Sequence, residues 1–170
     1  WLIGMSGSGK TTLGREIARQ LRTLAPNTVL LDGDELREVF AHDRGDAPYS
    51  IEGRRLNAER LTALCAMLDR QGVHVVCCVL SIFPAMREET RRRFSAYFEI
   101  FMDAPLAVLQ ARDVKGLYAA AGRGEVSNVV GVDIPFPRPV AADMVIDSSG
   151  NPDGLEHVAA RILTQTGLQG

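Results

Sequence analysis

The first candidate site is a glycine-rich segment, residues 4–11, with the sequence Gly-Met-Ser-Gly-Ser-Gly-Lys-Thr. A glycine, four residues and then Gly-Lys-Thr, placed between an apolar run and a helical pattern, is typical of a phosphate-binding loop. Its glycines let backbone N–H groups surround phosphate oxygens, and the following helix adds its positive dipole end. We predict that the loop binds ATP, with Lys10 at the β- and γ-phosphates and Thr11 on Mg²⁺. The predicted ATP-binding residues here are Gly4, Ser6, Gly7, Ser8, Gly9, Lys10, Thr11 and Thr12.

Two aspartates follow the next apolar run, and they are candidates for metal binding or proton transfer. Asp32 and Asp34 are separated by one glycine at the predicted carboxyl end of a strand. Carboxylates beside a phosphate site can hold Mg²⁺ or accept the proton of an attacking hydroxyl group. A structural role is also open, since Asp34 could cap the helix that follows. The residues alone leave the division of the two chemical roles open.

Arginines and an asparagine form a second candidate site. This set consists of Arg37, Arg54, Asn57 and Arg60, with Arg87 and Arg91 repeating the pattern on another helix. Arg54 and Asn57 are three residues apart on a predicted helix and therefore share one face of it. Guanidinium groups hold phosphate or carboxylate with two hydrogen bonds, so the set could bind an anionic acceptor. Solvated helix faces are the alternative, which we prefer for Arg55, Arg92, Arg93 and Arg161.

The hydrophobic pattern predicts the elements that must position these residues. Apolar runs predict five strands, at residues 1–5, 28–32, 73–80, 98–103 and 143–147. Helices are predicted at residues 10–24, 35–41, 51–71, 84–94, from 105 onward and at 155–166. Alternating apolar strands and helices indicate an α/β fold, with a doubly wound parallel sheet covered on both faces. Ligands of such sheets bind at the carboxyl ends of the strands, where the phosphate loop, both aspartates and Ser81 fall.

Length and composition limit what the chain can do. Its 170 residues, 46% hydrophobic and 24% charged, fit one globular domain over residues 1–170. We expect a soluble, cytoplasmic protein, because no apolar run suits a membrane span and no secretory signal is present. A net charge of −2 without a basic stripe argues against nucleic-acid binding. The chain begins at Trp1 within a predicted strand, so we expect a further segment or fusion partner upstream.

Lysine and cysteine are both rare in this sequence. The 19 basic residues include only two lysines, Lys10 and Lys115. The three cysteines include an adjacent pair in an apolar run, which predicts buried thiols rather than disulfides. Glycine and proline are concentrated in residues 116–139, which predicts a long, mobile segment.

Together these motifs resemble the adenylylsulfate kinase family. The resemblance extends to about residue 148 and rests on residues 4–11, 31–37, 111–118, 124–125 and 131–136. The phosphate loop alone is generic, whereas Asp-Gly-Asp with Lys-Gly-Leu-Tyr is specific to this family. The resemblance implies a homodimeric P-loop kinase that uses ATP and Mg²⁺ to phosphorylate the ribose 3′-hydroxyl of adenylyl sulfate. It also implies that residues 114–140 form a lid over the site.

The same resemblance implies roles for individual residues. The implied catalytic residues are Lys10, Asp32, Asp34 and the lid lysine, Lys115. Thr11 and Asp32 would hold the metal, and Arg112 would join the ATP-binding residues. The implied acceptor-binding residues are Asp34, Arg37, Tyr49, Arg54, Asn57, Ser81, Lys115 and Val129.

The chain departs from the family on the acceptor side. The family clamps adenine between two phenylalanines, which correspond here to Tyr49, which can still stack, and Val129, which cannot. An acceptor-side arginine of the family corresponds to Glu59. This pattern is similar to a branch of cytidine diphosphoramidate kinases, so that nucleotide is the alternative acceptor. A non-catalytic nucleotide-binding regulatory domain and a polynucleotide kinase are the alternatives of other classes, although Lys10 and both aspartates are retained.

Overall fold

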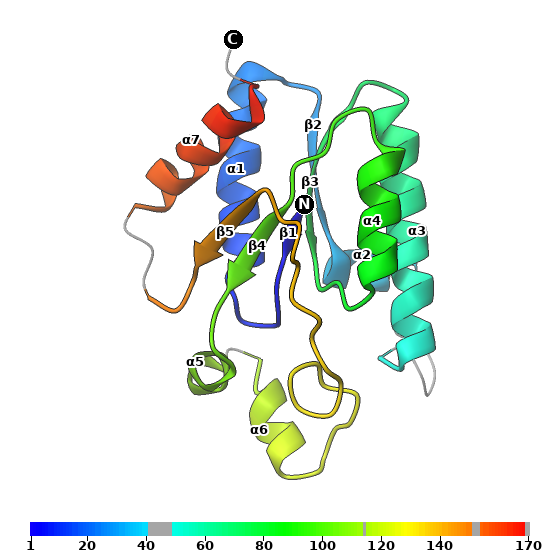
Figure 1. Ribbon diagram of the computed structural model, residues 1–170, viewed down its shortest axis with the longest axis vertical. Coiled ribbons are helices and arrows are strands. Elements are labelled where there is room, and N and C mark those ends of the chain that lie inside the picture. Colours follow the sequence, from blue (N-terminus) through cyan, green and yellow to red (C-terminus); the bar gives the residue numbers. More distant parts are fainter. Residues whose placement is uncertain (41–48, 114, 151–153, 169–170) are drawn as a thin grey trace.

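The computed structural model describes residues 1–40, 49–113, 115–150 and 154–168, in which strands and helices alternate (Figure 1). The strands are β1 (Leu2–Ile3), β2 (Thr28–Asp32), β3 (His74–Val79), β4 (Ile100–Asp103) and β5 (Met144–Asp147). The helices are α1 (Lys10–Leu24), α2 (Gly33–Val39), α3 (Ile51–Asp69), α4 (Pro84–Arg93), α5 (Leu106–Arg112), α6 (Leu117–Gly122) and α7 (Leu155–Thr166).

The five strands form one parallel sheet in the order β2-β3-β1-β4-β5, which confirms the predicted α/β class. The short strand β1 is central, and its Leu2 pairs with Cys78 of β3 and with Ile100 of β4. Because all strands run in one direction, their carboxyl ends lie at one edge, the lower edge in Figure 1. The loops that leave β1, β2 and β4 therefore open on the same side of the sheet.

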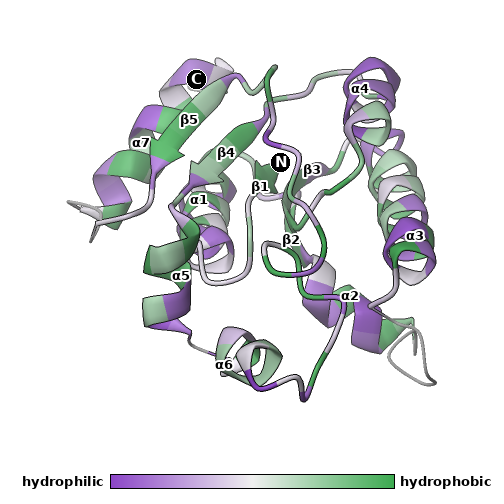
Figure 2. Cartoon of the chain, turned by 60° about the horizontal axis from the view of Figure 1, so that its bottom comes forward, coloured by the Kyte–Doolittle hydropathy of each residue, from purple (hydrophilic) through white to green (hydrophobic). Residues whose placement is uncertain are grey.

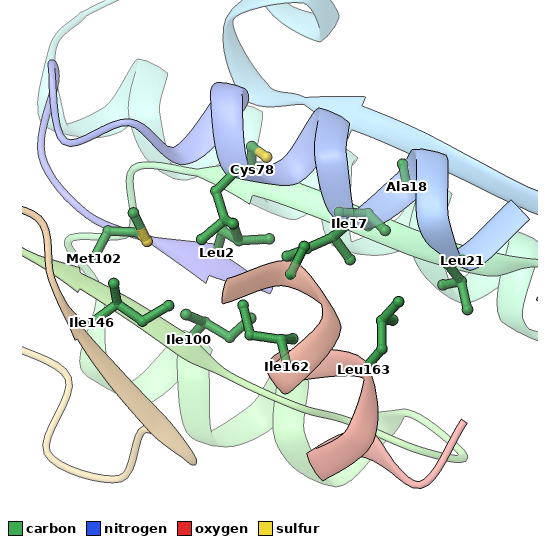
Figure 3. Close-up of a cluster of buried hydrophobic side chains, with 13 residues drawn as sticks. Leu2, Ile17, Ala18, Leu21, Cys78, Ile100, Met102, Ile146, Ile162 and Leu163 are labelled. Atoms are coloured by element: carbon green, nitrogen blue, oxygen red, sulfur yellow. The ribbon is translucent and has the colours of Figure 1, made fainter. Parts of the chain in front are cut away.

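Alternate strand residues pack against two different layers of helices. Leu2 and Cys78 lie in a buried cluster that includes residues of α1 and α7 (Figure 3). The neighbouring residues Ile3 and Cys77 lie in a second cluster with residues of α2 and α3. Figure 2 shows the strands in hydrophobic green, whereas the surrounding helices also carry hydrophilic residues. Both faces of the sheet are covered as predicted, which is why the strands are continuously apolar.

The segment after α5 is more regular than its glycines and prolines predict. Helix α6 occupies Leu117–Gly122 within it, because three consecutive alanines favour a helix. Asp113 accepts hydrogen bonds from the N–H groups of Tyr118 (3.0 Å) and Ala119 (2.8 Å) at the start of this helix. Residues 41 and 114, the predicted end of the second helix and start of the lid, lie outside the described residues. None of the described helices is long and apolar enough to cross a membrane.

Gly14 and Cys78 determine how closely α1 packs on the sheet. All three cysteines are free and buried, as predicted. Cys78 Sγ donates a hydrogen bond to the carbonyl oxygen of Lys10 at 3.3 Å, and burial raises the pKa of this thiol to about 12. A Cβ atom added at Gly14 would overlap Cys78 Sγ and lie 3.4 Å from Leu30 Cδ1. The close approach therefore requires glycine, even though glycine weakens the interior of a helix.

We predict that Gly14→Ala lowers the free energy of unfolding by about 1–3 kcal/mol, because the added methyl group overlaps Cys78. Without this contact, alanine would stabilise the helix by about 1 kcal/mol. Urea unfolding measures the difference. The double variant Gly14→Ala/Cys78→Ala is the matched control and should recover about half of the loss or more. A Gly14→Ala protein as stable as the parent would contradict this account.

Candidate functional site

The loop between β1 and α1 has a backbone conformation suited to an anion. Gly7 and Gly9 have φ angles of 79° and 85°, in the left-handed region that other residues rarely adopt. The loop leads directly into the N-terminus of α1, which carries free N–H groups and a positive dipole end. Ser8 Oγ is buried and has no hydrogen-bond partner within the described chain. A phosphate group supplies the acceptor atoms that these donors need.

Lys10 is the cation of this loop. Its Nζ donates a hydrogen bond to the carbonyl oxygen of Met5 at 2.7 Å, so the side chain folds back over the loop. Burial lowers the pKa of Lys10 from 10.5 to about 8, and the charges of Asp34 and Asp32 offset only part of this effect. The ammonium group is thus only partly compensated until an anion joins it, which suits a lysine that binds phosphate.

Thr11 and Asp32 connect the phosphate loop to the end of β2. Thr11 Oγ1 donates to Asp32 Oδ2 at 2.5 Å, and Asp32 Oδ1 accepts from the N–H group of Asp34 at 2.9 Å. Asp32, rather than Asp34, is therefore the N-cap of α2, which begins two residues earlier than predicted. The described residues contain no group of three His, Cys, Asp or Glu side chains arranged for a metal. A hydroxyl and one carboxylate still fit Mg²⁺, because substrate phosphates commonly supply its other ligands.

A cavity of about 570 Å³ lies beside the phosphate loop. Its lining includes Ser8, Gly9, Thr12, Met102, Arg112, Ile146, Ser148 and Leu155. The guanidinium group of Arg112 donates to the carbonyl oxygens of Ser149 (2.8 Å) and Gly150 (3.1 Å), which links α5 to the loop after β5. The volume is within the usual range for small-molecule sites, so the cavity can take the nucleoside end of a nucleotide whose phosphates lie in the loop.

An ion pair joins α2 to the segment that precedes α6. Lys115 Nζ donates to Asp34 Oδ2 at 2.5 Å, and the two side chains are 62% and 64% exposed. Partial desolvation raises the pKa of Asp34, but the hydrogen bond and charge of Lys115 outweigh it, and the pKa falls below its usual value. The same hydrogen bond raises the pKa of Lys115. Asp34 is therefore a carboxylate at neutral pH, with a cation beside it.

Arg37, Tyr49, Arg54 and Asn57 lie together on the other side of Asp34. The guanidinium carbons of Arg37 and Arg54 are 4.8 and 5.6 Å from the centre of the Tyr49 ring. Arg54 also donates to the carbonyl oxygens of Tyr49 (2.9 Å) and Asn128 (2.7 Å). Asn57 is buried, and its Oδ1 has no hydrogen-bond partner among the described residues. We call these four residues the acceptor cluster, since they offer a ligand two cations, a half-exposed ring and an amide oxygen.

Two of the predicted acceptor residues have other surroundings. Val129 is 2% exposed and packs with Leu109 and Tyr118, so its side chain does not line the acceptor cluster. An apolar valine is more stable in this contact than against a polar ligand. Ser81 follows β3, and its carbonyl oxygen accepts a hydrogen bond from Arg87 of α4 at 3.0 Å.

Other charged residues that the sequence singles out are held in surface pairs. Glu59 accepts a hydrogen bond from Arg55 on the exposed face of α3, which agrees with the solvated face predicted for Arg55. Arg91 donates to both carboxylate oxygens of Asp143, at 3.0 and 2.9 Å. The guanidinium group of Arg91 is thus paired in this structure, and its role in binding an anionic acceptor stays a prediction.

Sequence reasoning missed two residues that the structure places at the site. Tyr118 donates from its hydroxyl group to the carbonyl oxygen of Ser6 in the phosphate loop at 2.9 Å, and Asp113 accepts a hydrogen bond from the N–H group of Tyr118 near the start of α6. An aspartate shortly before a helical run is a usual sign of a helix start, so Asp113 could have been found. No local pattern indicates the contact of Tyr118, since its partner is 112 positions away.

Comparison with known proteins agrees with this geometry. The family model described as adenylylsulphate kinase matches residues 1–147. Adenylyl-sulfate kinase of Paraburkholderia xenovorans is 36% identical, with 100% of this chain and 95% of that protein covered. Cytidine diphosphoramidate kinase of Campylobacter jejuni is 39% identical, with 88% and 85% covered. The structure of the Mycobacterium tuberculosis APS kinase in complex with AMPPNP and APS has a TM-score of 0.84 at 30% identity, with 96% and 94% covered.

We predict that affinity for ATP falls as the pH rises through about 8, because Lys10 then loses the charge that attracts phosphate. The pKa of Lys10 is lower in the folded than in the unfolded chain, so stability rises with pH between about 8 and 10.5 while ATP affinity falls. Titration with a non-hydrolysable ATP analogue across this range measures the effect. The control is Lys10→Arg, which stays charged throughout. An equal fall in both proteins would exclude Lys10 as its cause.

Proposed function

The chain belongs to the adenylylsulphate kinase family, and on that basis we propose that it phosphorylates the ribose 3′-hydroxyl of adenylyl sulfate. Kinases of this family transfer phosphate from ATP to a hydroxyl group. The proposed product is 3′-phosphoadenylyl sulfate. A homodimeric state and a cytoplasmic location stay predictions. An upstream fusion partner also stays a prediction, and the relevant comparison is the bifunctional enzyme NodQ of Azospirillum brasilense, of which this chain spans 27%.

The position of Asp34 is the observation that carries the proposal. Its carboxylate lies close enough to Lys115, Lys10 and Arg37 for all three cations to lower its pKa. Lys10 belongs to the phosphate loop and Arg37 to the acceptor cluster, so Asp34 is near both. A phosphate that moves from ATP to a hydroxyl group would pass this carboxylate.

On the donor side, positioning and charge neutralisation are the main tasks. Lys10, Ser8 and the N–H groups of the loop would hold the β- and γ-phosphates, while Arg112 lines the nucleoside end. Thr11 and Asp32 would hold Mg²⁺, which supplies further positive charge at the phosphates when bound. Closure of the segment that carries Lys115 would exclude water from the reacting phosphate.

On the acceptor side, Asp34 would orient the attacking hydroxyl group. A bond forms between the hydroxyl oxygen and the γ-phosphorus as the bond from that phosphorus to the bridging oxygen of ADP breaks. The hydroxyl proton passes to Asp34. Because its lowered pKa makes Asp34 a weak base, this carboxylate acts mainly as a hydrogen-bond acceptor, and the proton leaves late in the transfer. Lys115 would neutralise charge on the phosphate in transit.

Cytidine diphosphoramidate is the second candidate acceptor. The relative of that name is 39% identical to this chain. Because the Val129 side chain is buried, Tyr49, which lies against both arginines, is the residue of the acceptor cluster on which a base would stack. A single stacking face suits a pyrimidine as well as a purine. Loss of a second stacking partner costs about 1–3 kcal/mol, which changes a preference without abolishing binding.

We predict ADP release with adenylyl sulfate in a coupled assay that contains ATP and Mg²⁺, and slower release with cytidine diphosphoramidate. Asp34→Asn should lower kcat by about 10²–10⁴-fold, because the amide cannot take the hydroxyl proton. Faster ADP release with cytidine diphosphoramidate would support the proposed phosphoryl transfer but identify that compound as the acceptor. Turnover with neither compound, in a protein that still binds ATP, would contradict the proposal and favour a non-catalytic nucleotide-binding domain.

We predict that Lys115→Ala lowers kcat by about 10²-fold and the free energy of unfolding by about 1 kcal/mol or less, since its ion pair is exposed. The matched control is Arg123→Ala, which removes an equally exposed pair with Glu125 from the same segment. Initial rates and thermal melting of both variants give the comparison. Parental turnover by the Lys115 variant, or an equal loss in the control, would remove Lys115 from the catalytic residues.

A further inference from the structure

We infer that Tyr118 is a positioning residue, which fixes the orientation of a backbone donor in the phosphate loop. The inference rests on the proposed function, because it concerns ATP bound at that loop. The hydroxyl group of Tyr118 donates to the carbonyl oxygen of Ser6 at 2.9 Å, a contact between α6 and the middle of the loop. The residue is 5% exposed, and burial raises its pKa, so the hydroxyl group stays protonated and remains a donor.

The hydrogen bond holds one peptide plane. The carbonyl group of Ser6 and the N–H group of Gly7 belong to the same trans peptide and point in opposite directions. With the carbonyl group held by Tyr118, the Gly7 N–H group is directed away from α6. Gly7 has a φ of 79° and no side chain to resist rotation, so the contact from Tyr118 adds a restraint on this plane to the hydrogen bond from Ser8 N–H to the Met5 carbonyl oxygen (3.3 Å), which closes the same turn. A fixed N–H group binds phosphate without the cost of ordering it first.

The surroundings of Tyr118 hold its ring in place. The ring lies in a buried cluster with Leu109 and Val129. Leu109 also borders the loop, since its Cδ2 atom would be 3.8 Å from a Cβ atom on Gly7. Asp113 accepts a hydrogen bond from the N–H group of Tyr118 at 3.0 Å and so fixes the start of α6. Val129 therefore acts on the site indirectly, as a support for this ring.

One short segment thus contacts both halves of the site. Lys115 pairs with Asp34, and Tyr118, three residues later, bonds to Ser6. Movement of this segment away from the sheet would break both contacts together. The donor loop would then lose its fixed peptide at the same time as Asp34 loses its cation, so ATP affinity should depend on the position of the lid.

The test is Tyr118→Phe, which keeps the ring and removes only the hydroxyl group. We expect the Kd for a non-hydrolysable ATP analogue to rise by about 3- to 10-fold, the usual effect of one neutral hydrogen bond. The KM for the nucleotide acceptor should stay unchanged. Calorimetric titration without acceptor gives the Kd, so the result does not depend on which nucleotide is phosphorylated.

The matched control is Tyr97→Phe, because Tyr97 donates to Glu99 Oε2 at 2.8 Å outside the site. This variant should lower the melting temperature and leave the Kd for the ATP analogue unchanged. Weaker ATP binding by the Tyr118 variant, at a melting temperature no lower than that of the Tyr97 variant, supports the inference. An unchanged Kd for the ATP analogue, or a weakening of ATP binding that the control shares, would overturn the inference. If such a protein still turns over at the parental rate, the proposed function stands. A parent protein that binds no ATP would overturn both.

Discussion

The short central strand β1 is the constraint on which the rest of the site depends. Leu2 and Ile3 are buried on opposite faces and are paired with strands on both sides, so the loop that follows them starts from a fixed point. The hydrogen bond from Thr11 to Asp32 then ties that loop to the end of β2. Asp32 in turn caps α2, which carries Asp34 and Arg37. These functional groups are thus connected to the central strand β1 through a series of direct contacts.

The charges of the site differ strongly in their access to water. Burial brings the pKa of Lys10 to about 8, whereas Asp34 and Lys115 form a largely exposed pair. Arg37 and Arg54 are stacked on one ring, and burial followed by the charge of Arg37 lowers the pKa of Arg54. Bringing these cations together is unfavourable in the empty protein, and anionic ligands relieve it. Part of the affinity for phosphates therefore comes from relief of the repulsion between these cations in the folded chain.

The elements and the phosphate loop could be predicted because their signals are local. Apolar runs such as residues 73–80 and the spacing of residues 4–11 are visible within a few positions. The partners of Val129 and Tyr118 were not predictable, since a buried valine and a tyrosine bonded to a distant loop leave no local pattern. Helix α6 was missed because the glycines around it masked a short alanine run. Motif position indicated which residues could act, but only the fold shows which of them meet.

The pairing of β1 also has a consequence for the order in which the molecule is built. Leu2 is made before its strand partners, Cys78 and Ile100, which lie far along the chain. Such pairs cannot form until both partners have been made, and closing the long loop between them costs conformational entropy. The nucleotide loop thus has no defined shape in a half-made chain. A nucleotide that binds only this finished loop stabilises the complete fold and none of its precursors.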